Sequence, residues 1–434
     1  MHSWRAPAIP ILSEAPKPPT IIFDSATKAL QVAASTAAPG SEQVARLYTC
    51  GITPYDATHI GHANTYLAFD LLVRAWLDQG YEVAFAQNVT DVDDPLLERA
   101  AATGVDWRHL AADQVQLFRD DMEALRVIPP HPWVSVSEAM PEIIAAVEQL
   151  LASGAAYRVA NEGLDSADIY FDISSDSSFG CVSHLPESEM LALFAERGGD
   201  PDRAGKRNQL DPLLWRAHRD GEPAWRSAVL GSGRPGWHIE CTVIAADALG
   251  PSFDVTGGGA DLLFPHHEMS ASLARALYGN EAKSPGARRF IHCGLISYEG
   301  EKMSKSLGNL VLVSQLTASG VDPMAIRLAL LAHHYQDYWE WTDAHLANAQ
   351  QRLSRWRTEL ASPPQVPEAP SSSLESVDGR VGAAINQMRA ALRDNLDAPR
   401  ALAVVDEYLQ ASDRNQAADA NMMSVIDALL GIKL

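Results

Sequence analysis

The sequence predicts an α/β fold: a parallel sheet in two halves, separated by an insertion and followed by helices. Runs of strand length alternate with helical patterns on both sides of an irregular, turn-rich stretch, an order typical of parallel sheets. Beyond Leu312 the pattern is helical, interrupted by a segment rich in proline and serine. At 434 residues the chain is long enough for two or three domains with buried cores.

The first half of the predicted sheet is a strand–helix–strand unit. Its helix opens after His59 and closes at Gly80, and Gly154 ends a later helix. In the second half, a helix leads to a strand, a run of three glycines, a further helix and a last strand. The predicted elements are strands 47–52 and 81–86, helices 106–126 and 138–153, helix 238–249, strand 252–255, a helix from about residue 266, and strand 289–292.

Composition divides the chain into regions as well as elements. The prolines and serines after residue 361 are typical of a linker. The first 45 residues are expected to form a loosely structured arm with at most one short strand, at 20–23. The predicted regions are an N-terminal arm (1–45), a Rossmann-type sheet domain (46–312) with an insertion at about 125–235, a helical region (313–361), a linker (362–376) and a C-terminal helical bundle (377–434).

Charge, hydrophobicity and cysteine content restrict the classes of function. The formal net charge of −21 argues against extensive contact with nucleic acid, although a local basic groove stays compatible with it. No apolar run is long enough to span a bilayer, and the proline-rich start lacks the apolar stretch of a signal peptide. Four cysteines in so long a chain indicate a reducing compartment. We expect a monomeric cytoplasmic protein without nucleic-acid or membrane partners.

Two motifs that lie far apart in the sequence contain side chains suited to binding phosphate groups. His59-Ile60-Gly61-His62 lies at a predicted helix start, where unpaired N–H groups and the helix dipole favour phosphate oxygens. Lys302-Met303-Ser304-Lys305-Ser306 places two ammonium groups in a glycine-flanked loop that can close over a leaving pyrophosphate. Taken singly, the histidines could cap the helix or bind a metal, and the lysine loop could simply be solvated.

In their order and context, these motifs make the chain similar to the class I aminoacyl-tRNA synthetases. The resemblance implies a class I synthetase fold and the activation of a carboxylate by Mg-ATP, with release of pyrophosphate. It assigns His59 and His62 to the charge that develops on the transferring phosphate, and Lys302 and Lys305 to the departing group.

Cys50, Cys241 and His266 are a candidate metal site that spacing by itself does not reveal. A cysteine after a strand is more often a small buried hydrophobic residue. However, the segments around these residues resemble those that hold zinc in the cysteinyl-tRNA synthetases, and the likeness runs nearly continuously from about Tyr48 to Asn309. The segments that carry it are Tyr48–Tyr55, Asn88–Asp94, Gly236–Cys241 and Phe264–Glu268.

The resemblance implies a zinc ion that binds the sulfur of the amino acid. Two thiolates and one imidazole fill three positions of a tetrahedral site, and the fourth can take the substrate thiolate. Serine cannot match that bond, so selectivity needs no editing domain. The synthetases carry a glutamate where this chain has Ser270, so we expect three protein ligands, with Glu268 as the alternative fourth. Cys181 and Cys293 are expected to be packing residues.

The same resemblance implies which residues surround the amino acid and the adenylate. Thr53, Thr90 and Trp237 would line the amino-acid pocket, although Thr90 could instead cap a helix and Trp237 could be an ordinary core aromatic. The other residues expected to contact the amino acid or the adenylate are Cys50, Gly51, Ile52, Thr65, Asn88, Val89, Gly259, Ala260, Asp261 and Ile296.

Activated cysteine could pass to tRNA or to a small amine, and the sequence favours the amine. About 125 residues remain after the lysine loop, which is short for the tRNA-binding part of a cysteinyl-tRNA synthetase, and the last helical segment has few basic residues. Glu196–Pro201 (ERGGDP), the start Ser3–Pro7 and Ser270 resemble the cysteine ligases of mycothiol biosynthesis in actinobacteria.

This second resemblance implies a reaction and its partners. The cysteine ligases join L-cysteine to glucosaminyl-inositol, so the expected partners are L-cysteine, ATP and glucosaminyl-inositol, with Zn²⁺ and Mg²⁺ as cofactors. Two alternatives stay open: a short cysteinyl-tRNA synthetase and a catalytically silent synthetase-like binding protein. Intact histidines and lysines in both motifs argue against the silent protein.

Overall fold

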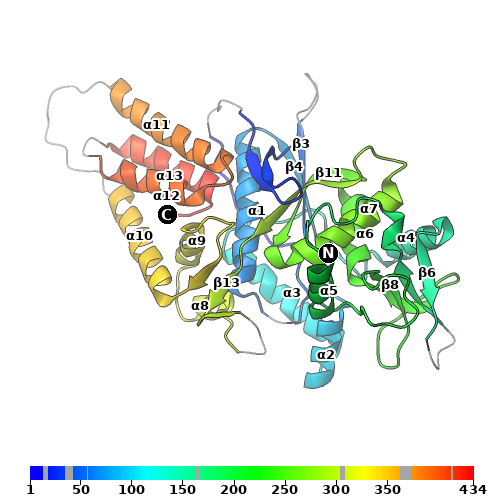
Figure 1. Ribbon diagram of the computed structural model, residues 1–434. Coiled ribbons are helices and arrows are strands. Elements are labelled where there is room, and N and C mark those ends of the chain that lie inside the picture. Colours follow the sequence, from blue (N-terminus) through cyan, green and yellow to red (C-terminus); the bar gives the residue numbers. More distant parts are fainter. Residues whose placement is uncertain are drawn as a thin grey trace.

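A five-stranded parallel sheet forms the centre of the computed structural model (Figure 1). The structure describes residues 1–12, 18–34, 43–55, 57–161, 166–303, 308–361, 374–411 and 414–434. The strand order is β12–β11–β3–β4–β5, and every neighbouring pair is parallel, as the sequence predicts. The strands are β3 (Val44–Thr49), β4 (Glu82–Val89), β5 (Trp133–Ser135), β11 (Ser252–Gly259) and β12 (Gly286–Cys293).

Two features of this sheet differ from the sequence prediction. β5 lies within the stretch assigned to the insertion, yet it pairs with β4 in the central sheet. It was not predicted because a strand of three residues is too short for its periodicity to be recognised. β11 also continues through the glycine run, beyond the predicted end of the strand at residue 255. Glycine is required there, since a Cβ on Gly257 would lie 2.0 Å from Cζ of Phe69.

Helices cover both faces of the sheet. α1 (Ile60–Asp78) lies on one face, and α6 (Trp237–Leu249) and α7 (Glu268–Tyr278) lie on the other (Figure 1). The two largest hydrophobic clusters follow this division, one built around α1 and the other around α6 and α7. The strand order reverses between β3 and β11, and the carboxyl ends of strands at such a point are the usual ligand site in α/β sheets.

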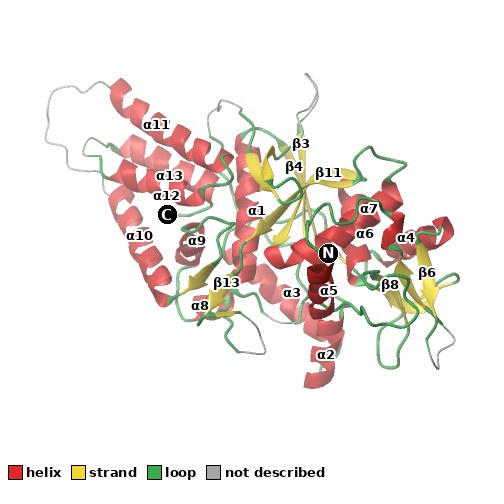
Figure 2. Cartoon of the chain, viewed as in Figure 1, coloured by secondary structure: helices red, strands yellow, loops and turns green. Residues whose placement is uncertain are grey.

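The insertion contains a second, antiparallel sheet, which Figure 2 shows apart from the central strands. Its strand order is β6–β7–β8–β10–β9. Two helices that precede it, α3 (Trp107–Ala124) and α4 (Met140–Ser153), confirm the predicted ones, whereas α2 (Asp94–Thr103) was not predicted. The elements of the insertion are β6 (Ala156–Val159), β7 (Asp168–Phe171), α5 (Glu187–Glu196), β8 (Leu213–Ala217), β9 (Trp225–Ser227) and β10 (Gly231–Pro235).

The N-terminal arm is more ordered than the sequence predicts. β1 (Ile21–Asp24) and β2 (Ala29–Val32) form an antiparallel hairpin. The Asp24 carboxylate accepts a hydrogen bond from the backbone N–H of Phe290 at 2.9 Å, which fixes the hairpin beside β12. Further upstream, Trp4 is buried and donates from Nε1 to the backbone oxygen of Val127 at 2.7 Å. These contacts could not be foreseen because they join distant parts of the chain.

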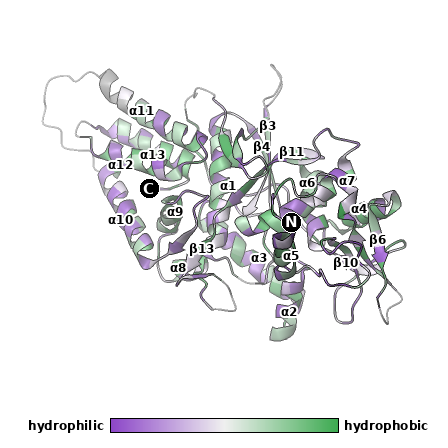
Figure 3. Ribbon diagram, in the orientation of Figure 1, coloured by the Kyte–Doolittle hydropathy of each residue, from purple (hydrophilic) through white to green (hydrophobic). Residues whose placement is uncertain are grey.

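The region after the central sheet is not wholly helical. A small sheet joins β13 (Ile296–Tyr298), β14 (Glu301–Lys302) and β15 (Trp339–Trp341). Of these strands, β15 lies beyond residue 312, where only helices were expected. The bundle helices alternate hydrophilic and hydrophobic residues, as Figure 3 shows. The predicted linker at 362–376 lies mostly outside the described residues. The helices of this region are α8 (Val313–Ala318), α9 (Pro323–Leu331), α10 (Asp343–Ala361), α11 (Leu374–Arg393), α12 (Ala398–Leu409) and α13 (Gln416–Leu430).

None of the helices in the described part of the chain combines the length and the apolar character that a membrane crossing requires. The division into domains stays a prediction.

Candidate active site

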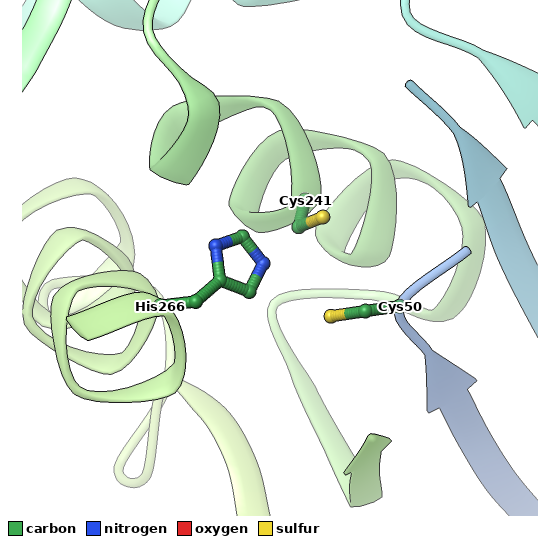
Figure 4. A group of neighbouring side chains, drawn as sticks. All are labelled: Cys50, Cys241 and His266. Carbon is green, nitrogen blue, oxygen red and sulfur yellow. The ribbon is translucent and has the colours of Figure 1, made fainter. Parts of the chain in front are cut away.

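Three predicted ligands from distant segments lie together at the carboxyl edge of the central sheet (Figure 4). Cys50 follows β3, Cys241 lies in the second turn of α6, and His266 lies in the turn just before α7. Their ligand atoms all lie within 4.8 Å of one another, and all three side chains are buried. The fold therefore assembles two sulfurs and one imidazole into a single buried group.

The donor atoms of this group fit a soft divalent metal. His266 Nδ1 lies 3.1 Å from Nδ1 of His238, whereas the buried His266 Nε2 has no hydrogen-bond partner among the described residues. Burial lowers the pKa of His266, so its ring is neutral and has a lone pair to offer. A hydrogen bond with Cys241, together with burial, raises the pKa of the Cys50 thiol, so a metal must displace a proton there.

The candidate fourth ligands have other roles. The Glu268 carboxylate accepts hydrogen bonds from the backbone N–H groups of Gly180, Val182 and Ser183 at 2.9, 3.0 and 2.7 Å, so it fixes a loop of the insertion. Ser270 donates to the backbone oxygen of His238 at 3.4 Å. Glu268, the alternative fourth ligand, is therefore engaged by the backbone of the insertion instead.

The two remaining cysteines differ from each other. Cys293 is fully buried in β12, as expected of a packing residue. Cys181 is exposed, so the prediction that it packs in the interior is wrong. Cys50, Cys241 and Cys293 are thus buried and Cys181 is not. Among the described residues, only Cys50 and Cys241 belong to a group that could hold a metal ion.

Residues at the ends of β3 and β4 and just after them form a hydrogen-bonded network beside Cys50. The Asn88 side-chain oxygen accepts from Tyr48 Oη at 3.0 Å and from the Gly51 N–H at 2.8 Å, while its Nδ2 donates to Thr90 Oγ1 at 2.9 Å. The Thr90 N–H donates to the backbone oxygen of Ile52 at 2.9 Å. A Cβ on Gly51 would lie 1.6 Å from the Asn88 carbonyl oxygen, so only glycine allows this approach.

The alternative interpretations of Thr90 and Trp237 do not hold. Asp93, not Thr90, is the N-cap of α2. The Trp237 ring stacks on the His266 ring with centroids 4.4 Å apart and is only half-buried, so it is not an ordinary core aromatic. Val89 is fully buried as the last residue of β4, and Thr53 is half-buried in the turn after Cys50.

The motif histidines lie at the start of α1, as predicted. His59 is its N-cap, and its Nδ1 accepts from the backbone N–H of Gly61 at 3.1 Å. The His59 and His62 rings stack with centroids 3.8 Å apart, and the His62 side chain is exposed. One turn further, Thr65 Oγ1 donates to the Gly61 oxygen at 3.3 Å. Two imidazoles therefore lie at the open, positive end of this helix.

The segment after the lysine loop is hydrogen-bonded to the turn that carries His59. Ile60 N–H donates to the Val311 oxygen at 2.9 Å, and Val313 N–H donates to the Thr58 oxygen at 3.1 Å. These bonds bracket an antiparallel bridge between His59 and Leu312. The side chain of Lys302 and the whole of Lys305 lie outside the described residues, but the return of their loop is fixed beside the histidine motif.

The residues assigned to the adenylate follow the ends of β11 and β12. β11 ends at Gly259, and Ala260 and Asp261 form a short 3-10 turn. Ile296 is buried at the start of β13.

Arg197, which belongs to the ERGGDP segment, has contacts at the site that its sequence did not predict. This guanidinium donates to the backbone oxygen of Asp261 at 2.6 Å and to that of Phe264. Only the family resemblance of the segment could have pointed to it.

The chain is similar in sequence to a known family and to known proteins. Residues 36–351 match the family described as the class I (C) tRNA synthetase catalytic domain. A protein of Xylanimonas cellulosilytica is 54% identical and one of Cellulomonas flavigena is 55% identical, each over 100% of this chain and 100% of its own length. Both relatives are named L-cysteine:1D-myo-inositol 2-amino-2-deoxy-alpha-D-glucopyranoside ligase.

Solved structures are similar in fold. The methionyl-tRNA synthetase of Mycobacterium tuberculosis, bound by methionyl-adenylate, aligns over 90% of this chain and 92% of its own, with a TM-score of 0.60 and 16% identity. The LeuRS of Agrobacterium radiobacter K84, in its ternary complex, aligns over 92% of this chain and 84% of its own, with a TM-score of 0.63 and 12% identity. These likenesses confirm the class I synthetase fold.

Proposed function

Because this chain belongs to the family of the L-cysteine:1D-myo-inositol 2-amino-2-deoxy-alpha-D-glucopyranoside ligases, within the class I synthetases, we propose that it joins L-cysteine to the amine of glucosaminyl-inositol. The enzyme is an ATP-dependent, AMP-forming ligase of mycothiol biosynthesis. In the first step, the cysteine carboxylate attacks the α-phosphorus of ATP and pyrophosphate leaves. In the second, the glucosamine amine attacks the carbonyl carbon of cysteinyl-adenylate, loses a proton and forms the amide as AMP leaves.

We assign Cys50, Cys241 and His266 as the protein ligands of one zinc ion. The donor set supports this assignment, since two thiolates and one imidazole match the tetrahedral preference of zinc and leave one position open. When bound, zinc offers that position to the substrate sulfur and favours its thiolate form. We also assign Trp237, whose ring stacks on that of His266, and Thr90, which is hydrogen-bonded to Asn88, to the amino-acid pocket.

We assign His59 and His62 to the α-phosphate and Lys302 and Lys305 to the departing pyrophosphate, with Mg²⁺ carried by the nucleotide. Imidazole N–H groups at the start of α1 can donate to phosphate oxygens as charge develops on them. The return of the lysine loop beside His59 supports this assignment, because it brings both motifs to one end of α1.

The observation that carries the proposal is the position of the sulfur-binding group relative to the phosphate-binding motif. Tyr66, on the helix that begins with the motif, donates from Oη to the backbone oxygen of Cys50 at 3.4 Å. The group that would hold the amino acid and the helix that would hold its activating phosphate are thus in direct contact. The reacting carboxylate and the α-phosphorus then meet at one edge of the sheet.

An isotope-exchange experiment tests the activation step. The enzyme should exchange labelled pyrophosphate into ATP only when L-cysteine is present, and L-serine should not replace it. Exchange without an amino acid, or with serine as efficiently as with cysteine, would contradict the sulfur-binding site. A protein without catalytic activity would show no exchange at all.

The acceptor is tested by supplying both candidates. With Mg-ATP and L-cysteine, glucosaminyl-inositol should be consumed and the cysteinyl amide should form, while tRNA should stay uncharged. Acylated tRNA without amide product would identify a short cysteinyl-tRNA synthetase instead. We further propose a monomeric enzyme in a reducing cytoplasm, where Cys50 and Cys241 stay free to bind metal; size-exclusion chromatography with light scattering measures the first point.

A further inference from the structure

A chain of four side chains leads from Cys50 to the N-terminal hairpin. His267 Nε2 lies 3.3 Å from the Cys50 sulfur, and His267 Nδ1 lies 2.8 Å from Nε2 of His292. His292 Nδ1 in turn lies 2.7 Å from the Ser25 hydroxyl. The four residues come from the end of β3, the turn before α7, β12 and the β1–β2 turn, so only the tertiary fold joins them.

The His267 ring, in the middle of these four side chains, is held in place. His267 is 1% exposed, and both of its ring nitrogens are occupied by the contacts with Cys50 and His292. A Cβ on Gly258 would lie 3.3 Å from the His267 ring, so the neighbouring strand already packs closely against it. A buried ring with two directed contacts and no free space has little freedom to reorient.

Ser25, at the other end of this series of hydrogen-bonded side chains, is equally well fixed. Ser25 donates from its backbone N–H to the Phe290 oxygen at 2.9 Å, and His184 Nε2 lies 2.6 Å from the Ala26 oxygen. Because Phe290 and His292 lie on the same strand, these bonds keep the Ser25 hydroxyl next to the His292 ring.

The direction of the hydrogen bonds follows from the donors available. A neutral imidazole carries one N–H and one lone pair, so the role of one nitrogen fixes the role of the other. When Cys50 is a thiolate, it can only accept, so His267 donates from Nε2 and accepts at Nδ1. His292 must then donate from Nε2 and accept at Nδ1. The Ser25 hydroxyl lies within reach of that last nitrogen and can supply the proton.

We propose that Ser25, His292 and His267 position Cys50 as a metal ligand, with the Ser25 hydroxyl setting the tautomers of both imidazoles so that His267 donates to the sulfur. This inference depends on the metal centre proposed above. Hydrogen bonds to ligand atoms hold them in a binding geometry and stabilise the bound metal. The N-terminal hairpin is thereby a working part of the metal centre, although its sequence shows no metal-binding pattern.

Substitutions of Ser25 test this role without touching a metal ligand. Ser25→Ala removes the donor, Ser25→Thr keeps it, and Thr27→Ala is a matched control in the same turn, since Thr27 donates to Asp24 instead, at 2.9 Å. The measurements on the full-length proteins are the zinc dissociation constant, by competition with a chromogenic chelator, and the thiolate-to-metal absorption of the cobalt-substituted proteins. Circular dichroism checks that each variant is folded.

The expected result is a zinc dissociation constant about tenfold higher for Ser25→Ala, with a shifted cobalt absorption band, and values within about twofold of the wild type for Ser25→Thr and Thr27→Ala. Ser25→Ala should add little to the effect of His292→Ala, because both interrupt one chain. Wild-type affinity and spectrum for Ser25→Ala would overturn the inference, as would an equal loss in Thr27→Ala. A wild-type protein that binds neither metal would instead overturn the metal centre itself.

Discussion

At the scale of single residues, the four cysteines separate by environment. Cys241 lies beside Cys50 and His266, whereas Cys181 is exposed and far from any such group among the described residues. Cys241→Ala should lose bound zinc and reduce cysteine-dependent pyrophosphate exchange by at least about 100-fold, because two donors hold the metal poorly. Metal analysis and the exchange assay measure the two effects. Cys181→Ala is the matched control and should keep both, and full activity in metal-free Cys241→Ala would refute the metal's role.

Asp121 is a buried carboxyl that gives the protein a pH-dependent stability. It lies on α3 beside Thr58, and its Oδ2 has no hydrogen-bond partner among the described residues. Burial raises the pKa of Asp121 to about 7, above the value of the unfolded chain. The folded state therefore holds a proton that the unfolded state has released, so this contribution to stability declines as the pH rises from about 4 to about 7.

Asp121→Asn should remove the loss of stability that the wild-type protein shows as the pH rises. We expect the variant to be more stable than the wild type by roughly 1 to 3 kcal/mol at pH 8 and equally stable at pH 4. Urea unfolding at several pH values measures the difference. Asp120→Asn is the control, because Asp120 is the exposed neighbour on the same helix and should show no such trend. A wild-type advantage at pH 8 would contradict the assignment.

At the scale of elements, the insertion is hydrogen-bonded to the turn between β11 and α7 through the residue that follows α5. Arg197 follows α5 and bonds the backbone oxygens of Asp261 and Phe264, which flank the turn before His266. Gly198 then takes a positive φ of 86° that lets the chain turn back. The ERGGDP segment therefore fixes the position of the turn that contains Asp261.

Arg197→Ala should lower kcat/KM for ATP in the exchange reaction by about 10- to 100-fold, because the unanchored turn no longer places Asp261. Arg197→Lys should not restore it, since both hydrogen bonds come from Nη1 of Arg197 and the lysine ammonium lies one bond nearer the backbone. Arg203→Ala is the control within the insertion, because Arg203 bonds Ala160 and Asn161 instead. Unchanged kinetics in Arg197→Ala would show that the turn holds its shape without this anchor.

At the scale of the whole molecule, a buried charge cluster joins the C-terminal bundle to α1. The Asp70 carboxylate accepts from Arg74 at 2.7 Å and from Arg327, and all three side chains are fully buried. Burial would raise the pKa of Asp70, but the charges of Arg327 and Arg74 lower it. The two arginines also donate to backbone oxygens near the end of α13, Arg74 to Asp427 at 2.9 Å and Arg327 to Leu430 at 2.6 Å.

Removal of one charge from this cluster should destabilise the protein. Arg327→Ala should lower the free energy of unfolding by about 3 to 5 kcal/mol, because the remaining buried groups lose a partner. Urea unfolding followed by circular dichroism measures the change. Arg400→Ala is the control, since its ion pair with Glu407 is exposed, and should leave the midpoint nearly unchanged. A similar midpoint for both variants would show that the cluster contributes little.

Local patterns determined the elements that the sequence revealed by itself. The helix after His59, the strands around it and the glycines that end helices are set by periodicity and turn chemistry within a few residues. The ligand types at positions 50, 241 and 266 could be recognised because their segments resemble a known zinc-binding set. The roles of His59, His62, Lys302 and Lys305 stay predictions until the exchange experiments test them.

The tertiary structure decided what depends on contacts between distant segments. Short strands such as β5 and β15 form because a neighbouring strand pairs with them, not because three residues prefer to be extended. Only folding brings certain distant segments within a few ångströms of one another. Examples are the anchoring of the N-terminal hairpin, the Arg197 contacts and the hydrogen-bonded side chains from Cys50 to Ser25. Sequence fixes which chemical groups are present, but only packing decides which of them meet, because hydrogen bonds and metal bonds act over such short distances.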